Sequence, residues 1–119
     1  MRTPSERFDD LVIDAATRLE RLWGKPLPDI QFAVEAVPPS DPAPWEDRDL
    51  PLGRLFPARR GLASQIVLYR RPIETRAHDA RDLASLVEDV VTEQVAACLG
   101  VRPDELDPGY GQPGYGQPG

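Results

Sequence analysis

Residues 79–100 read DARDLASLVEDVVTEQVAACLG, and this stretch predicts the long helix around which the rest of the chain is organised. Asp79 can cap its start, and Gly100 suits the left-handed residue that follows a last helical turn. Apolar residues recur at steps of three and four, over a face wide enough to pack on two sides. They are Leu83, Leu86, Val87, Val90, Val91, Val95, Cys98 and Leu99. The stretch therefore predicts a central helix.

A second amphipathic helix is predicted over residues 4–23. Its apolar stripe consists of Phe8, Leu11, Val12, Ala15, Leu19, Leu22 and Trp23. Thr3 and Glu6 have the spacing of a capping box, and Pro4 suits the first helical position. Gly24 suits the residue after the last turn. Both ends of this helix are therefore marked in the sequence.

Three short strands are predicted between the helices. Residues 30–35 alternate apolar and polar side chains, and residues 52–56 form a shorter candidate. Residues 64–70 alternate again, until Pro72 is expected to end the strand. The proline-rich segment 37–49 is expected to be a loop, in which Trp45 either packs onto the sheet or anchors a partner.

In the strand at residues 64–70, the alternation separates two sets of side chains. Ile66 and Leu68 fall on one face, and Gln65, Val67 and Tyr69 fall on the other. Strands of this kind need a partner layer on the apolar face, which the two helices can supply.

The composition is that of one globular domain. The chain has 119 residues, 40% hydrophobic and 29% charged, which is enough to build a stable core. The predicted fold class is α+β, with two long helices packed on a small mixed sheet of about three strands over residues 1–108. Residues 109–119 are two copies of Gly-Tyr-Gly-Gln-Pro plus a glycine, and we expect them to be a disordered tail.

Charge and cysteine content exclude several classes of function. The net charge of −6 argues against nucleic-acid binding, which needs a basic face. No stretch has the roughly 20 apolar residues that cross a bilayer, and the N-terminus has no signal-peptide pattern. Cys98 is the only cysteine, so an intrachain disulfide is excluded. We therefore expect a cytoplasmic protein without nucleic-acid or membrane partners.

The basic residues are concentrated in one segment. Residues 54–76 hold six arginines and one glutamate, a local charge of +5 that leaves −11 for the rest of the chain. Five of these arginines flank the predicted strands, namely Arg54, Arg59, Arg60, Arg70 and Arg71. They are candidate binding residues for an acidic or C-terminal carboxylate ligand. Alternatively, they guard a solvated sheet edge against aggregation.

The order of elements, together with LGRLF at residues 52–56 and IVLYRRPIE at residues 66–74, resembles the small zincin-like metallopeptidases of bacteria. The resemblance spans residues 5–107 and implies a minimal zincin fold. It also implies a last helix with the motif Val-Val-His-Glu-x-x-His. In that motif two histidines one turn apart hold Zn²⁺, and the glutamate deprotonates the metal-bound water.

Both histidines of the motif are absent here. When the motif is aligned on Glu93, this residue takes the general-base position, and the ligand positions become Thr92 and Ala96. The resemblance would carry the third, acidic ligand to Asp104. Because alanine offers no donor atom, at least one ligand is missing in this alignment.

An alignment on Gly100 gives a different result. It places Glu93 and Ala97 at the ligand positions and Gln94 at the position of the base. The only histidine, His78, lies roughly 20 Å away along the helix axis, too far to substitute. In either alignment we expect no bound zinc and no other cofactor.

Three functions remain open at this stage. The first is a catalytically silent family member, a pseudoenzyme that binds a peptide or protein with its sheet edge and old active-site cleft. The second is an active metallopeptidase with a carboxylate metal site built from Glu93, Asp104 and an acidic loop residue, although carboxylates alone suit Mg²⁺, Ca²⁺ or Mn²⁺ better. The third is a structural or assembly subunit that associates through the tail or the second long helix.

Overall fold

The computed structural model describes residues 2–39 and 50–111 and has an α+β fold. The elements are α1 (Pro4–Trp23), β1 (Ile30–Glu35), β2 (Gly53–Phe56), β3 (Ser64–Tyr69), α2 (Arg70–Arg76), α3 (Ala80–Leu99) and α4 (Pro103–Leu106). The two long helices and the three strands are confirmed. The predictions for Trp45 and for residues 112–119 lie outside the described residues. Among the helices described, none is long and apolar enough to cross a membrane.

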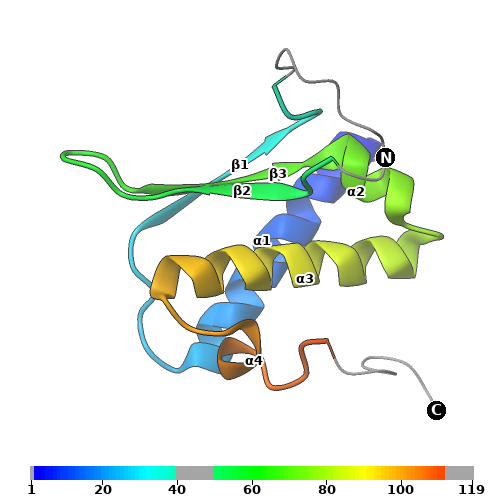
Figure 1. Cartoon of the computed structure of the whole chain (residues 1–119). Helices are drawn as coiled ribbons and strands as arrows, with labels where there is room; N and C mark the ends of the chain where they lie inside the picture. The colour runs from blue at the N-terminus through cyan, green and yellow to red at the C-terminus, as the bar shows by residue number, and fades with distance from the viewer. Residues whose placement is uncertain (1, 40–49, 112–119) are drawn as a thin grey trace.

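The three strands form one mixed sheet in the order β1-β3-β2. β1 runs parallel to β3, with Ile30 opposite Ser64, and β2 runs antiparallel to β3, with Gly53 opposite Leu68. β3 is therefore the central strand. Within the described part of the chain β2 pairs with β3 alone, so β2 forms an edge of the sheet beside α3 (Figure 1).

α1 begins and ends where the sequence predicts. The Thr3 hydroxyl accepts from the Glu6 backbone N–H at 3.1 Å, and the Glu6 carboxylate accepts from the Thr3 N–H at 3.2 Å. Gly24 has φ of 71°, a left-handed conformation in which a side chain would be strained. These local hydrogen bonds fix the helix, and its buried stripe then packs against α3.

The core fills the space between the sheet and the two long helices. Ile66 and Leu68 of β3 point into it and are fully buried. The other members of the core come from α1, α2, α3 and α4: Phe8, Val12, Ala15, Leu19, Ile73, Val87, Val90, Val91, Val95, Ala96 and Leu106. Because α3 contacts both α1 and the sheet, it is the central helix that its wide apolar face predicts (Figure 1).

Two details differ from the sequence prediction. Val67 and Tyr69 are each only 2% exposed, so β3 is buried on both faces near its end. Pro72 does not simply end the strand, because residues 70–76 continue as the short helix α2. Pro72 lies in the first turn, where backbone N–H groups have no intrahelical partner and proline is tolerated.

Gly53 lets β2 approach α3 closely. A Cβ atom at this position would lie 2.9 Å from Val90 Cγ1 and 3.6 Å from Gln94 Cγ. Any larger residue would push the edge strand away from the helix. The glycine of the LGRLF segment therefore places β2 directly beside the second half of α3.

Candidate functional site

The two residues that the alignment on Glu93 gives as metal ligands point into the core. Thr92 and Ala96 are each only 1% exposed. The Thr92 hydroxyl donates to the Glu88 carbonyl at 2.7 Å, a bond to the preceding helical turn. Ala96 is a member of the hydrophobic core. Neither side chain reaches a surface that a substrate could approach.

Glu93, Ala97 and Gln94 lie on a different side of α3. Glu93 and Ala97 are exposed, and Gln94 is half-buried beside Gly53 of the edge strand. At about 100° per residue, Ala97 falls between the other two when the helix is viewed along its axis. We call these three residues the outer face of α3. Through Gln94 it adjoins Gly53 of β2, the edge strand that a peptide could approach.

The C-terminal segment contacts this outer face. The Tyr110 hydroxyl donates to the Glu93 carboxylate Oε2. Burial, and then the hydrogen bond and charge of Glu93, raise the pKa of Tyr110 above that of a free tyrosine. One turn before Glu93, burial followed by the charge of Glu93 raises the pKa of Asp89. The outer face is therefore an acceptor surface, which Tyr110 partly covers.

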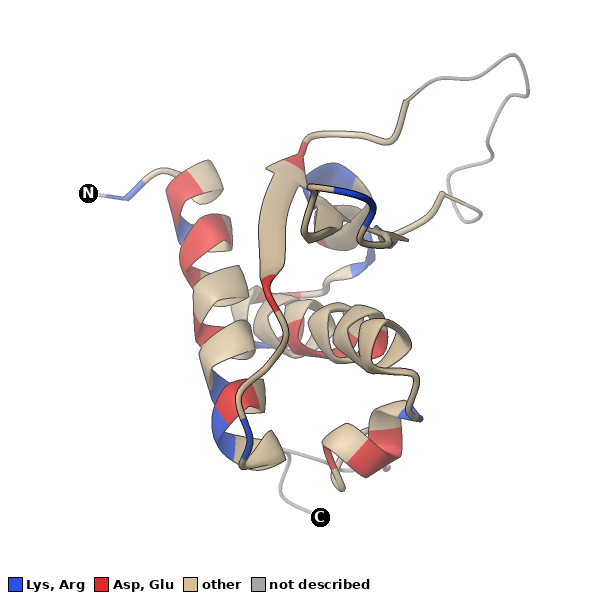
Figure 2. Cartoon of the chain, turned by 90° about the vertical axis from the view of Figure 1, so that its left-hand side faces the viewer, with Lys and Arg blue, Asp and Glu red and all other residues tan. Residues whose placement is uncertain are grey.

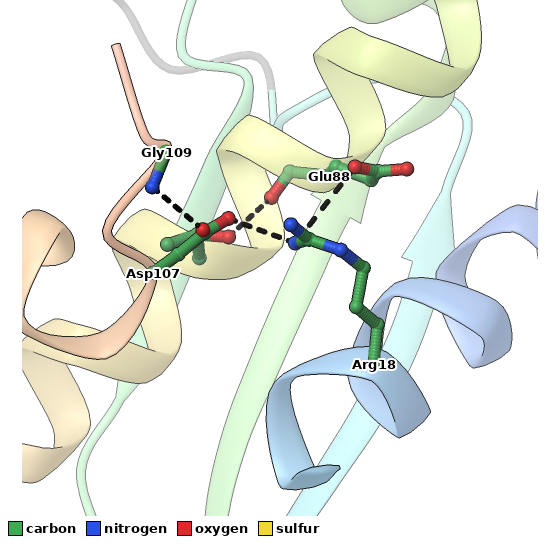
Figure 3. Close-up of polar contacts among 5 residues, drawn as sticks. Arg18, Glu88, Asp107 and Gly109 are labelled. Atoms are coloured by element: carbon green, nitrogen blue, oxygen red, sulfur yellow. Dashed lines mark hydrogen bonds and ion pairs between the residues drawn. The ribbon is translucent and has the colours of Figure 1, made fainter. Parts of the chain in front are cut away.

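Three elements meet at a partly buried ion pair beside the middle of α3 (Figure 3). Arg18 of α1 donates to Asp107 Oδ2 at 2.8 Å and lies 3.9 Å from the Glu88 carboxylate. Asp107 is only 4% exposed, and its Oδ1 accepts from the Gly109 N–H at 3.1 Å. This pair fastens the end of α4 to α1 and directs the following residues toward the outer face.

Sequence reasoning missed this ion pair and the role of Tyr110. Arg18 and Asp107 are 89 residues apart, so no local pattern connects them. The sequence Asp107-Pro108-Gly109 does carry a signal, since it is typical of a turn that could direct Tyr110 back. The structure describes the chain as far as Gly111, and the boundary between domain and tail at residue 108 stays a prediction.

Asp104 takes no part in the contact between Tyr110 and Glu93. Its carboxylate is exposed and accepts from Arg102 Nε at 3.1 Å. His78 is exposed just before α3, where its backbone N–H donates to Asp82 Oδ2 at 2.9 Å. In residues 2–39 and 50–111, no group of three histidine, cysteine or acidic side chains is arranged to hold a metal ion.

The donor chemistry of the outer face does not fit a zinc ion. Zinc sites of this kind use two histidines one turn apart with a third protein ligand. Here the corresponding positions offer the Glu93 carboxylate, already bonded to Tyr110, and the methyl group of Ala97, which has no donor atom. The outer face therefore lacks the set of ligands that would hold a zinc ion and activate its water.

The five candidate arginines do not form one cluster. Arg59 and Arg60 lie at the tip of the β2–β3 hairpin, and Arg70 and Arg71 lie beyond the other end of β3. The six residues of β3 separate the two pairs by roughly 20 Å at 3.3 Å per residue. The charged residues of the hairpin and α2 are mostly arginines, whereas those of α3 and α4 are mostly Asp and Glu (Figure 2).

Arg54 is the candidate arginine on the edge strand itself. It is exposed and lies over the Phe56 ring, with the guanidinium carbon 5.0 Å from the ring centroid. The Arg70 guanidinium, in contrast, donates a hydrogen bond to the Glu74 carboxylate at 3.1 Å within α2. Of the predicted binding residues, Arg54 is therefore the one placed to meet a ligand that approaches β2.

The hydrogen-bond pattern of the hairpin identifies the free backbone groups of β2. The Tyr69 N–H donates to the Leu52 carbonyl at 3.0 Å, so residues 52 and 69 form a hydrogen-bonded pair. Such pairs alternate along an antiparallel ladder, and the next ones are Arg54 with Val67 and Phe56 with Gln65. The backbone groups of Gly53 and Leu55 consequently point away from β3.

A comparison with known protein families matches residues 27–112 to the zincin-like metallopeptidases. The chain belongs to this family. The match runs from the residues before β1 to just past Gly111, so it includes the edge strand, α3 and Tyr110. A search of curated proteins found no match. Family members normally depend on zinc, which makes the side chains at the motif positions decisive for this chain.

Proposed function

We propose that this zincin-like domain is catalytically silent and binds a peptide or protein segment along the free edge of β2. The observation that carries the proposal is the position of that edge. In the part of the chain that the structure describes, the outward backbone groups of Gly53 and Leu55 pair with no other strand, and Gly53 lies beside Gln94 of the outer face of α3. Strand addition uses such groups for affinity and the neighbouring side chains for specificity. Neither requirement depends on a metal ion.

The orientation of α3 favours the alignment on Gly100 for the lost site. A metal ligand must face the cleft in which substrate and water meet, and Glu93 and Ala97 are exposed whereas Thr92 and Ala96 are not. In this alignment Gln94 replaces the general base. A neutral amide cannot accept a proton at neutral pH, so the chain lacks a base as well as a ligand.

The chemistry beside β2 favours a ligand with a carboxylate. A strand added at Gly53 and Leu55 would pass Arg54, whose planar guanidinium binds carboxylates with paired hydrogen bonds. Phe56 holds the guanidinium from one side. The expected partner is therefore an extended segment with an aspartate, a glutamate or a C-terminal carboxylate. A cytoplasmic location is part of the same proposal.

The test is a screen of extended peptides, followed by NMR mapping of the best binder. We expect the largest shifts at the Gly53 and Leu55 amides, and loss of binding when the peptide N–H groups that face β2 are methylated. Methylation of the alternate N–H groups is the matched control. Arg54→Gln should weaken binding by roughly threefold to tenfold, whereas Arg7→Gln on the exposed side of α1 should not. Binding that leaves the β2 amides unshifted would refute strand addition.

The carboxylate metallopeptidase gains no support from the described residues. The Glu93 carboxylate accepts a hydrogen bond from Tyr110, and the Asp104 carboxylate accepts one from Arg102. The two carboxylates therefore belong to separate contacts. The acidic residues that would complete that site fall in segment 40–49, outside the described residues. The assembly function would use the tail or α3, and Tyr110, the first tyrosine of the tail, contacts Glu93 of α3.

A further inference from the structure

Tyr110 contacts Glu93, the residue that the alignment on Gly100 places at the first metal-ligand position of the family. Its hydroxyl donates to Glu93, and its ring is partly buried. Two backbone bonds present it there: its own N–H donates to the Asp107 carbonyl at 2.9 Å, and the Gly109 N–H donates to the Asp107 side chain. The buried Asp107 thus fixes the turn that aims the tyrosine at α3.

The fold itself does not require Tyr110. α4 is already anchored by Leu106, which is buried in the core, and by Asp107 through Arg18. Tyr110 follows both anchors and is not a member of the hydrophobic core. The contact of Tyr110 with Glu93 therefore resembles the binding of a ligand side chain to the surface of a folded domain, and it differs from the packing of a core residue.

The acceptor surface suits a phenol. Glu93 and Asp89 lie one turn apart, and a hydrogen bond donated to one carboxylate stabilises its negative charge against the repulsion of the other. A tyrosine supplies one neutral O–H donor together with a flat apolar ring, which can lie on the helix at low entropic cost. Gly111, directly after Tyr110, has φ of 69°, a left-handed conformation that glycine adopts without strain.

The sequence repeats the docked segment. Residues 109–113 and 114–118 are both Gly-Tyr-Gly-Gln-Pro, so the chain carries a second copy of the segment whose tyrosine contacts Glu93. We propose that the outer face of α3 is a binding site for glycine-flanked tyrosine segments. Tyr110 is its resident occupant, and a second Gly-Tyr-Gly-Gln-Pro segment can replace it. This site is independent of strand addition at β2.

The experiment uses the chain cut after Pro108 and the free peptide Gly-Tyr-Gly-Gln-Pro-Gly. In backbone NMR titrations we expect saturable shifts at the amides of Asp89, Glu93 and Ala97, with half-saturation in the millimolar range. The full chain should bind the peptide several-fold more weakly, because Tyr110 competes at an effective concentration on the order of millimolar. The same competition would distinguish the chain's own tail from a tail supplied by another copy, since only the second depends on protein concentration.

Two controls make the result specific. A peptide with phenylalanine in place of tyrosine should bind about fivefold more weakly, as expected for one lost hydrogen bond. Glu93→Gln should weaken tyrosine binding, whereas Asp104→Asn, at an exposed carboxylate off this face, should not. If the chain cut after Pro108 shows no shift at the three amides up to about 10 mM peptide, the proposal is overturned. That peptide concentration is well above the effective concentration expected for Tyr110 in the full chain. Equal binding of the phenylalanine peptide, or tighter binding of a lysine peptide, would also overturn it.

Discussion

Two matched histidine pairs test the orientation of α3 and the alignment that follows from it. The first variant combines Thr92→His with Ala96→His. The second combines Glu93→His with Ala97→His and restores the base through Gln94→Glu. Both place histidines one turn apart, and they differ in the side of the helix that carries them.

The structure predicts opposite effects on stability. Thr92 and Ala96 are 1% exposed, so each histidine there costs about 1–3 kcal/mol for overpacking. An imidazole without a buried partner adds about 1–3 kcal/mol. Together these exceed about 4 kcal/mol, a large part of the roughly 5–15 kcal/mol that holds a domain folded. The exposed pair should change stability by no more than about 0.5 kcal/mol per site.

Thermal unfolding followed by circular dichroism, with and without zinc, measures both effects. The first variant should melt at least about 15 °C lower than the parent, at roughly 4–8 °C per kcal/mol. The second should melt close to the parent. Zinc at ten times its dissociation constant should stabilise the second variant by about 1.4 kcal/mol. A first variant that is stable and binds zinc, together with a second that does neither, would refute the orientation of α3.

Three further predictions follow from the ion pair, the acidic turn and the C-terminal contact. Arg18→Ala should lower the free energy of unfolding by about 2–3 kcal/mol, because it leaves the buried Asp107 carboxylate without its main partner; this is below the cost of breaking a fully buried pair, since Arg18 is 26% exposed. Asp89→Asn should raise the melting temperature at pH 7. The raised pKa of Asp89 means that the folded chain loses stability as the pH rises from the unfolded pKa, about 3.9, through the folded pKa, so the gain should vanish below that window. Removing residues after Gly111 should leave stability unchanged, whereas removing them after Pro108 should cost about 1 kcal/mol through the lost bonds of Tyr110 and Gly109.

Each of these predictions has a control in the same chain. Arg102→Ala breaks an exposed pair and should cost at most about 0.5 kcal/mol, so an equal loss in both arginine variants would contradict the buried role of Arg18. Asp104→Asn is the control for Asp89, and a gain of the same size in both would point to net charge rather than burial. Identical melting curves for the two truncated chains would mean that Tyr110 contributes nothing to stability.

Local chemistry made most of the fold predictable. The capping box of Thr3 and Glu6, and the left-handed glycines after both long helices, act within a few residues. The burial of Tyr69 could not be predicted in the same way, because alternation indicates two different faces but not whether a second layer covers both. Pro72 was misleading since proline ends a strand and also suits the first turn of a helix.

The candidate site was less predictable for a geometric reason. Residues 92 and 96 lie one turn apart, and so do residues 93 and 97, so helical spacing cannot choose between the two alignments. The choice depends on which side of α3 faces the sheet and α1, a tertiary property. The contact between Tyr110 and Glu93 likewise depends on the position of α4, which the distant Arg18 holds through Asp107.

The metal content of the purified chain tests the central claim most directly. Elemental analysis of protein prepared without added metal or chelator gives the number of zinc ions per chain. If the domain is catalytically silent, we expect far less than one equivalent of zinc per chain, because Ala97 has no donor atom and the Glu93 carboxylate accepts a hydrogen bond from Tyr110. One equivalent of zinc that survives dialysis would contradict the account and would restore the metallopeptidase as the leading function.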